Sequence, residues 1–172
     1  MVAVNPARRR ITAVAVVAAL GAGAWAAWHA GRPVPAPAVS YTLLDGSTAG
    51  LKQLQGKVVL VNFWATTCAI CLAEMPRMVA THLKYQPRGF ETVAVAMRWD
   101  PPAHVIRYAQ ARRLPFGVAI DTTGEIARRF GDVEVTPTSV LINRRGEIVK
   151  RFVGEPDFPR LHELVEKLLA EA

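Results

Sequence analysis

The chain has 172 residues, 51% of them hydrophobic and 20% charged, a size and composition that fit a single globular domain. The first 32 residues hold four arginines and no acidic residue, so the net charge of +7 falls to +3 (17 basic minus 14 acidic side chains) for the rest. No run of basic residues interleaved with aromatic residues occurs in the sequence. We therefore expect no nucleic-acid partner.

An uncharged stretch occupies residues 11–30, directly after Arg8-Arg9-Arg10. As a helix, these 20 residues would span about 30 Å, the thickness of the apolar part of a bilayer. The positive-inside rule keeps the arginines in the cytoplasm and exports the rest of the chain. A cleaved signal peptide is the alternative, because Ala24-Trp25-Ala26 has the small-x-small form of a cleavage site. The predicted segments are a cytoplasmic basic segment (1–10), a transmembrane anchor or signal peptide (11–30), a Pro-rich extended spacer (31–39) and one domain (40–172).

The two cysteines of the chain lie where a predicted strand runs into a predicted helix. Residues 57–63 form an apolar run typical of a strand buried on both faces. Cys68 then falls at the first turn of a helix, where unpaired N–H groups and the helix dipole stabilise a thiolate, so it is the predicted nucleophile. Cys71, about one turn further on, is the predicted resolving cysteine of a redox-active disulfide. The helix is indicated by apolar residues at helical spacing: Leu72, Met75, Val79 and Leu83.

Other functions of a Cys-x-x-Cys pair fit this sequence less well. A zinc site needs four ligands, and the four histidines are scattered without paired spacing. A structural disulfide across a two-residue gap would constrain little of the unfolded chain. The alternative function that we retain is a Cu(I)-binding metallochaperone using both cysteines, aided by Met75 or Met78 of the same helix. Core packing is the alternative role of the two methionines.

The rest of the chain alternates strands and helices. Such alternation implies right-handed parallel crossovers, and a final hairpin adds an antiparallel edge to the sheet. The prediction is an α/β domain with a mixed central sheet flanked by helices. Strands are predicted at 90–97, 116–120, 138–143 and 147–153, and helices at 103–113, 125–130 and around 161–169.

Four motifs occur in order along the chain: Trp64-Ala65, Cys68-x-x-Cys71, Glu74-Met75-Pro76 and Val135-Thr136-Pro137-Thr138. Together they resemble the TlpA/ResA-like branch of the thioredoxin superfamily, bacterial extracytoplasmic thiol-disulfide oxidoreductases that include the reductants of cytochrome c maturation. The resemblance covers about residues 40 to 170 and implies a thioredoxin-like fold. Residues 43–57 are similar to the additional N-terminal β-hairpin and turn of that branch.

The resemblance implies roles for several residues. Pro137 would be a cis-proline facing the disulfide, which leaves the backbone of Thr136 free to pair with an extended substrate segment. Glu74 would be a functional acid that takes the proton of the resolving cysteine. The aspartate that a thioredoxin usually buries in the preceding strand is replaced by Asn62, which cannot titrate. Two tryptophans, Trp64 and Trp99, are the further predicted substrate-binding residues, with core packing as the alternative for Trp99.

The expected function is a membrane-tethered reductant of protein disulfides, with apocytochrome c as one substrate that the resemblance implies. The expected partners are a disulfide-containing protein and a membrane thiol electron donor, and no cofactor or metal is expected. Either reading of residues 11–30 places the domain in the bacterial periplasm, attached to the inner membrane if the segment is retained. The chain departs from the family at Thr67, usually tryptophan, and at Ala69-Ile70, usually a proline-containing pair. Because Ala69-Ile70 offers no positive charge to hold a thiolate, it favours a reductant over a strong oxidant.

Overall fold

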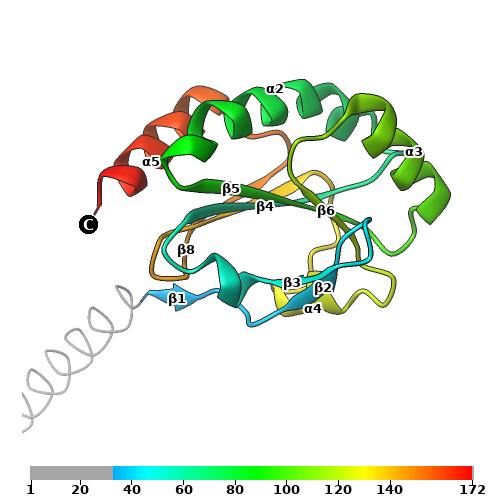
Figure 1. Ribbon diagram of the computed structural model, residues 1–172, viewed down its shortest axis with the longest axis horizontal. Helices are drawn as coiled ribbons and strands as arrows, with labels where there is room; N and C mark the ends of the chain where they lie inside the picture. Colours follow the sequence, from blue (N-terminus) through cyan, green and yellow to red (C-terminus); the bar gives the residue numbers. More distant parts are fainter. Residues whose placement is uncertain (1–32, 172) are drawn as a thin grey trace, which may run out of the picture. The chain divides into compact units, whose positions relative to one another are not determined.

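The computed structural model describes residues 33–171, which are built around one mixed β-sheet (Figure 1). The strand order is β1-β8-β7-β4-β5-β6. Strands β4, β5 and β6 run parallel, whereas β7 is antiparallel to both β4 and β8. The predicted mixed α/β sheet is thus confirmed. Its strands are β1 (Val34–Pro35), β4 (Val58–Trp64), β5 (Phe90–Ala96), β6 (Gly117–Ile120), β7 (Thr138–Ile142) and β8 (Glu147–Val153).

Helices cover the sheet on both faces (Figure 1). One face packs against α2 (Ala69–Tyr85), α3 (Pro102–Arg112) and α5 (Phe158–Ala170). The other packs against α4 (Glu125–Arg129) and the hairpin β2 (Ser40–Thr42) and β3 (Thr48–Gly50). The alternation along β4 explains both cores, because Val58 and Leu60 face the first set of elements and Val59 and Val61 the second. Two 3₁₀ helices, η1 (Leu51–Leu54) and η2 (Gln86–Arg88), precede β4 and β5.

The predicted N-terminal hairpin is present and reaches the far edge of the sheet. Strands β2 and β3 pair antiparallel, and Gly46 supplies a positive φ of 83° in the turn between them. Leu43 forms an isolated antiparallel bridge to Ala119 of β6, and the N–H of Leu44 donates to the carbonyl of Val118 at 3.2 Å. The hairpin therefore partly covers the edge of β6.

The domain begins earlier than the sequence suggested. Val34 pairs with Ile148 of β8, and the N–H of Ala36 donates to the carbonyl of Gly146 at 2.8 Å. The backbone N–H groups of alternate residues in a strand point toward the partner strand, as that of Ala36 does here. The nitrogen of Pro35 therefore points toward the open edge of the sheet, where the lack of an N–H donor costs little. The compact unit starts at Val34, so residues 34–39 belong to the domain and correct the predicted spacer.

The predicted anchor at residues 11–30 lies outside the described residues. Between residues 33 and 171, no helix has both the length and the apolar character needed to cross a membrane.

An arginine in the turn between β7 and β8 holds three distant segments together. The Arg144 guanidinium donates to the carbonyls of Gly56 at 2.8 Å, Leu169 at 3.3 Å and Arg88 at 3.4 Å. These carbonyls lie just before β4, near the end of α5 and at the end of η2. One guanidinium thus supplies hydrogen-bond donors to three carbonyls at the ends of separate segments, which would otherwise depend on water for a donor.

Replacing this arginine tests its importance for stability. Arg144→Ala should lower the free energy of unfolding by about 2–3 kcal/mol, because three carbonyls lose a charged donor. The control is Arg145→Ala, whose exposed ion pair with Glu147 contributes less than about 1 kcal/mol. Urea titrations of both variants give the comparison. Equal losses would show that the three carbonyl contacts add nothing.

Candidate active site

Cys68 and Cys71 form a disulfide at the start of α2, with their Cα atoms 5.2 Å apart. Cys68 is the N-cap of the helix, one position before the first turn in which the sequence placed it. Its Sγ accepts a hydrogen bond from the N–H of Cys71 at 3.2 Å. This N–H and the positive end of the helix would stabilise a Cys68 thiolate after reduction.

The two sulfurs differ in accessibility. Cys68 is partly exposed, whereas Cys71 is fully buried in the core beneath α2. An approaching protein can therefore reach only Cys68. This asymmetry agrees with the predicted division into a nucleophile and a resolving cysteine.

The loop before β7 faces the disulfide. The Thr136–Pro137 peptide bond is cis, as the family resemblance implied, and Pro137 is buried. The carbonyl oxygen of Thr136 lies 3.6 Å from Cys68 Sγ. The backbone of Thr136 is thus adjacent to the predicted nucleophilic sulfur.

A polar cluster is buried directly below the motif. Asn62, Glu74 and Ser139 are all fully buried. The Asn62 amide donates to Glu74 Oε1 and to Ser139 Oγ, each at 3.0 Å. Asn62 Oδ1 and Glu74 Oε2 have no hydrogen-bond partner among the residues that the structure describes. The cluster fixes one carboxyl oxygen and leaves the other available.

Glu74 is the group in this cluster that titrates. Burial raises the pKa of Glu74 to about 7, against the opposing effects of the Asn62 hydrogen bond and the positive charge of Arg77. The carboxyl therefore exchanges its proton near neutral pH. Such a pKa suits a general acid or base.

The two predicted tryptophans occupy different environments. Trp64 is fully buried, with its ring 5.4 Å from that of Tyr108, so it offers no surface to a substrate. This corrects the predicted contact: as the last residue of β4, Trp64 points into the core under α2 and α3. Trp99 is 50% exposed in the loop after β5, which excludes its alternative role as a core residue.

A buried aspartate that the sequence analysis missed joins this loop to the motif. Asp100 is 1% exposed, and its carboxylate accepts hydrogen bonds from both the N–H and the hydroxyl of Thr66. Thr66 lies two residues before Cys68. Asp100 therefore connects the loop that bears Trp99 to the loop between β4 and α2, which leads to Cys68. Its position after a strand that neighbours the motif strand was the available signal.

The methionines offered as additional copper ligands do not face the cysteine surface. Met75 and Met78 are 2% and 1% exposed and belong to the core between α2 and the sheet. Their core-packing role is confirmed.

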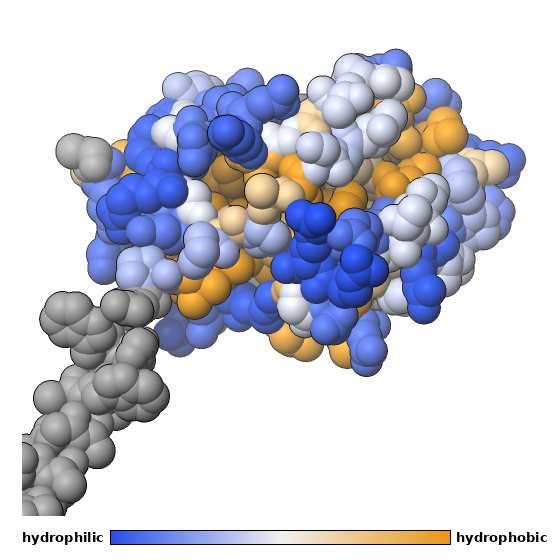
Figure 2. Space-filling view, turned by 90° about the horizontal axis from the view of Figure 1, so that it is seen from below, coloured by the Kyte–Doolittle hydropathy of each residue, from blue (hydrophilic) through white to orange (hydrophobic). Residues whose placement is uncertain are grey.

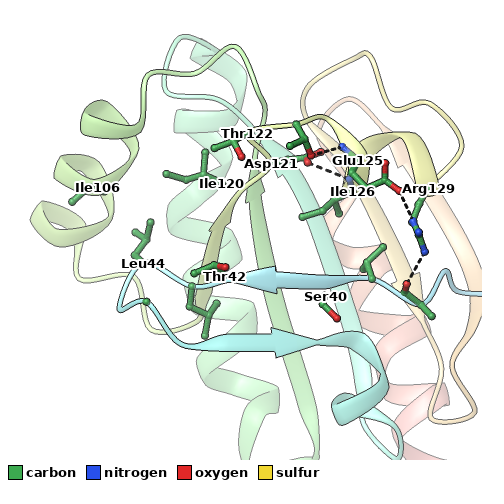
Figure 3. Close-up of a pocket in the computed structure, with 15 residues that line it drawn as sticks. Ser40, Thr42, Leu44, Ile106, Ile120, Asp121, Thr122, Glu125, Ile126 and Arg129 are labelled. Carbon is green, nitrogen blue, oxygen red and sulfur yellow. Dashed lines mark hydrogen bonds and ion pairs between the residues drawn. The ribbon is translucent and has the colours of Figure 1, made fainter.

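A hollow of about 690 Å³ lies apart from the cysteines, between the hairpin, α4 and Ile106 of α3 (Figure 3). Seen from the side of the hairpin and α4, hollows with apolar residues are bordered by hydrophilic ones (Figure 2). The charged groups here bind one another or the backbone: Asp121 accepts from the N–H groups of Ile126 and Ala127, and Arg129 pairs with Glu125. No residue of the Cys-x-x-Cys motif lines this hollow.

Residues 29–166 match the Redoxin family. The chain belongs to this family. This redoxin is 35% identical over 133 residues to the thiol-disulfide oxidoreductase ResA of Bacillus thuringiensis subsp. konkukian, covering 77% of this chain and 76% of the relative. It is 34% identical over 137 residues to ResA of Halalkalibacterium halodurans, covering 78% and 77%. A crystal structure of a thioredoxin family thiol:disulfide interchange protein from Chlorobium tepidum aligns with a TM-score of 0.74 and 30% identity, covering 81% of this chain and 98% of that one.

These similarities confirm two expectations from the sequence. The redoxin has a thioredoxin-like α/β fold and is a ResA-like thiol-disulfide oxidoreductase. The disulfide between Cys68 and Cys71 supplies the dithiol pair that such an activity needs.

The raised pKa of Glu74 predicts a dependence of stability on pH. A carboxyl with a folded pKa of about 7 and an unfolded value near 4.5 stabilises the fold fully below pH 4.5 and loses that contribution as pH rises through 7. The stability of the wild type relative to Glu74→Gln should therefore fall by about 3 kcal/mol between about pH 4 and 8. Denaturant titrations of both oxidised proteins across this range measure it. A difference that does not change with pH would contradict the raised pKa.

Proposed function

We propose that this redoxin reduces disulfides in exported proteins. The observation that carries the proposal is the contrast between the partly exposed, N-capping Cys68 and the fully buried Cys71. In the reduced enzyme the Cys68 thiolate attacks a substrate disulfide, forming a mixed disulfide and releasing one substrate thiolate, which takes up a proton. The Cys71 thiolate then attacks Cys68 Sγ, which closes the enzyme disulfide and releases the second substrate sulfur. Two electrons pass from the enzyme dithiol to the substrate.

Glu74 acts in the second step. Cys71 must lose a proton before it can attack, and its buried sulfur has little access to water. Glu74 lies three residues further along α2, and one of its carboxyl oxygens has no hydrogen-bond partner within the described part of the chain. Its pKa of about 7 allows it to accept a proton from Cys71 and return it to solvent in the next cycle.

Substrate binding involves the loop with the cis-proline that faces the disulfide. An extended substrate segment pairs with the backbone of Thr136, next to the cis-proline, where main-chain hydrogen bonds make little demand on substrate sequence. The half-exposed Trp99, in the loop that Asp100 joins to Thr66, adds apolar contact with the substrate.

The proposed cellular context rests on the amino terminus and on the ResA relatives. Residues 11–30 anchor the chain in the bacterial inner membrane, and the domain lies in the periplasm. A thiol donor in the membrane reduces the enzyme again. A role in cytochrome c maturation, with apocytochrome c as substrate, follows from the resemblance to the TlpA/ResA-like branch and is part of the proposal.

The reduction potential of the Cys68–Cys71 pair decides whether the enzyme donates electrons. Equilibration of the full-length protein in graded dithiol buffers, followed by thiol alkylation and mass measurement, should give a value near or below about −250 mV. The expected low potential follows from the absence of a positive or imidazole side chain at Ala69-Ile70. A value near about −120 mV would instead identify an oxidant that introduces disulfides.

Trapping identifies the substrate and tests the order of attack. Cys71→Ser should accumulate a stable mixed disulfide between Cys68 and an exported protein in cells, seen by non-reducing electrophoresis and mass spectrometry. Cys68→Ser is the matched control and should trap much less, because Cys71 is buried. Equal trapping by both variants, or none by either, would contradict the proposed roles.

A further inference from the structure

A second hollow lies beside the active site, between the motif loop and α3. It has a volume of about 440 Å³ and is lined by Thr66, Thr67, His104, Arg107, Tyr108 and Ala111. We call it the α3 groove. Thr66 and Thr67 immediately precede Cys68, so a substrate chain bonded to Cys68 Sγ starts within a few residues of the groove. The exposed Thr67 lies at the edge of this space.

One wall of the groove is the aromatic ring of Tyr108, which packs against the protein core. The Tyr108 ring lies 5.4 Å from the ring of the buried Trp64, and the Arg112 guanidinium lies 5.8 Å from the centre of the same tyrosine ring. Ala111, one turn from Arg107 on α3, adds a small apolar surface. An apolar wall next to arginine can take the methylene groups of an acidic side chain while the arginine binds its carboxylate.

The charge around the groove is one-sided. Helix α3 contains no acidic residue. Arg107 lines the groove, and the Arg112 guanidinium lies near the Tyr108 ring. Arg113 follows Arg112 directly and lines a separate hollow with Asp45. Among residues 33–171, the side chains of these three arginines form no ion pair or hydrogen bond. Other arginines of the domain are paired: Arg77, Arg88, Arg128, Arg129 and Arg145 all contact glutamates.

Asp100, the buried acid bonded to Thr66, makes no direct contact that would neutralise these arginines. Asp100 is buried, and both of its carboxylate oxygens accept hydrogen bonds from Thr66. The unpaired guanidinium of Arg107 therefore remains available to a carboxylate from another molecule.

We propose that the α3 groove binds an aspartate or glutamate of the substrate protein located within a few residues of its disulfide. The carboxylate pairs with Arg107, and the side chain packs against Tyr108 and Ala111. The enzyme then reduces disulfides with acidic neighbours faster than neutral ones, because the arginines attract and orient such segments before Cys68 attacks. This inference rests on the proposed function and specifies its class of substrate.

The test compares two synthetic peptides, each with one internal disulfide, that differ only in glutamate or glutamine beside the cysteines. Stopped-flow reduction by the reduced full-length protein in mild nonionic detergent gives second-order rate constants. At low salt the glutamate peptide should react about fivefold faster, and about 0.5 M salt should remove most of this difference. Arg107→Gln should lose the preference, so that its rate constants for the glutamate and glutamine peptides become equal.

A charge-matched control separates the groove from the net charge of the protein. Lys167→Gln removes one positive charge from the last turn of α5, beside the Arg88–Glu166 ion pair at the far end of α2 from Cys68. This variant should keep the preference for the glutamate peptide. Equal rates for the two peptides, or a preference that survives in Arg107→Gln, would overturn the groove proposal alone. Failure to reduce either peptide would overturn the proposed function and the groove proposal with it.

Discussion

The hydrogen bond from the Asn62 amide to the Glu74 carboxyl joins the central strand to the helix that carries both cysteines. Only residues 65–68 connect the end of β4 to the start of α2, so the position of Cys68 depends on how that helix lies against that strand. Apolar packing fixes the distance between them but allows small shifts along the helix axis. A directional bond between two fully buried side chains is more selective, because a shift would leave both groups unsatisfied.

The same contact couples stability to chemistry. A carboxyl placed in the core costs free energy whenever it is ionised. Asn62 offsets only part of that cost, because one Glu74 oxygen has no hydrogen-bond partner among residues 33–171. A better-satisfied carboxylate would stabilise the fold at neutral pH and would have a lower pKa, which would make it a poor acceptor for a thiol proton. The incomplete hydrogen bonding of Glu74 is thus a compromise that the proposed proton transfer explains.

Local patterns in the sequence predicted most of the fold, and long-range register explains what they could not. The apolar run at 57–63 and the helical spacing after Cys68 depend on neighbours in the chain, and both elements are where they were expected. Ser139 was missed because its contact with Asn62 follows from the register of β7 against β4, which one sequence does not reveal. Asp100 was missed for a similar reason, since its partner Thr66 is 34 positions away. Trp64 was misassigned because a motif position does not show which way a side chain at the end of a strand points.

Cys68 is close to two surfaces that we propose to bind substrates by different physical means. On one side, the backbone of Thr136 offers hydrogen bonds that any extended chain can satisfy, so this side supplies affinity with little selectivity. Next to Thr66 and Thr67, the α3 groove presents Arg107, which forms no ion pair within residues 33–171, beside the ring of Tyr108. Charge acts over roughly 10 Å at moderate salt, whereas hydrogen bonds form only at contact, so the arginines act first on an approaching chain. An acidic residue drawn toward α3 leaves the other flank of the substrate disulfide facing Thr136. The groove therefore sets the direction in which the substrate chain crosses Cys68, and the backbone pairing then holds it for attack.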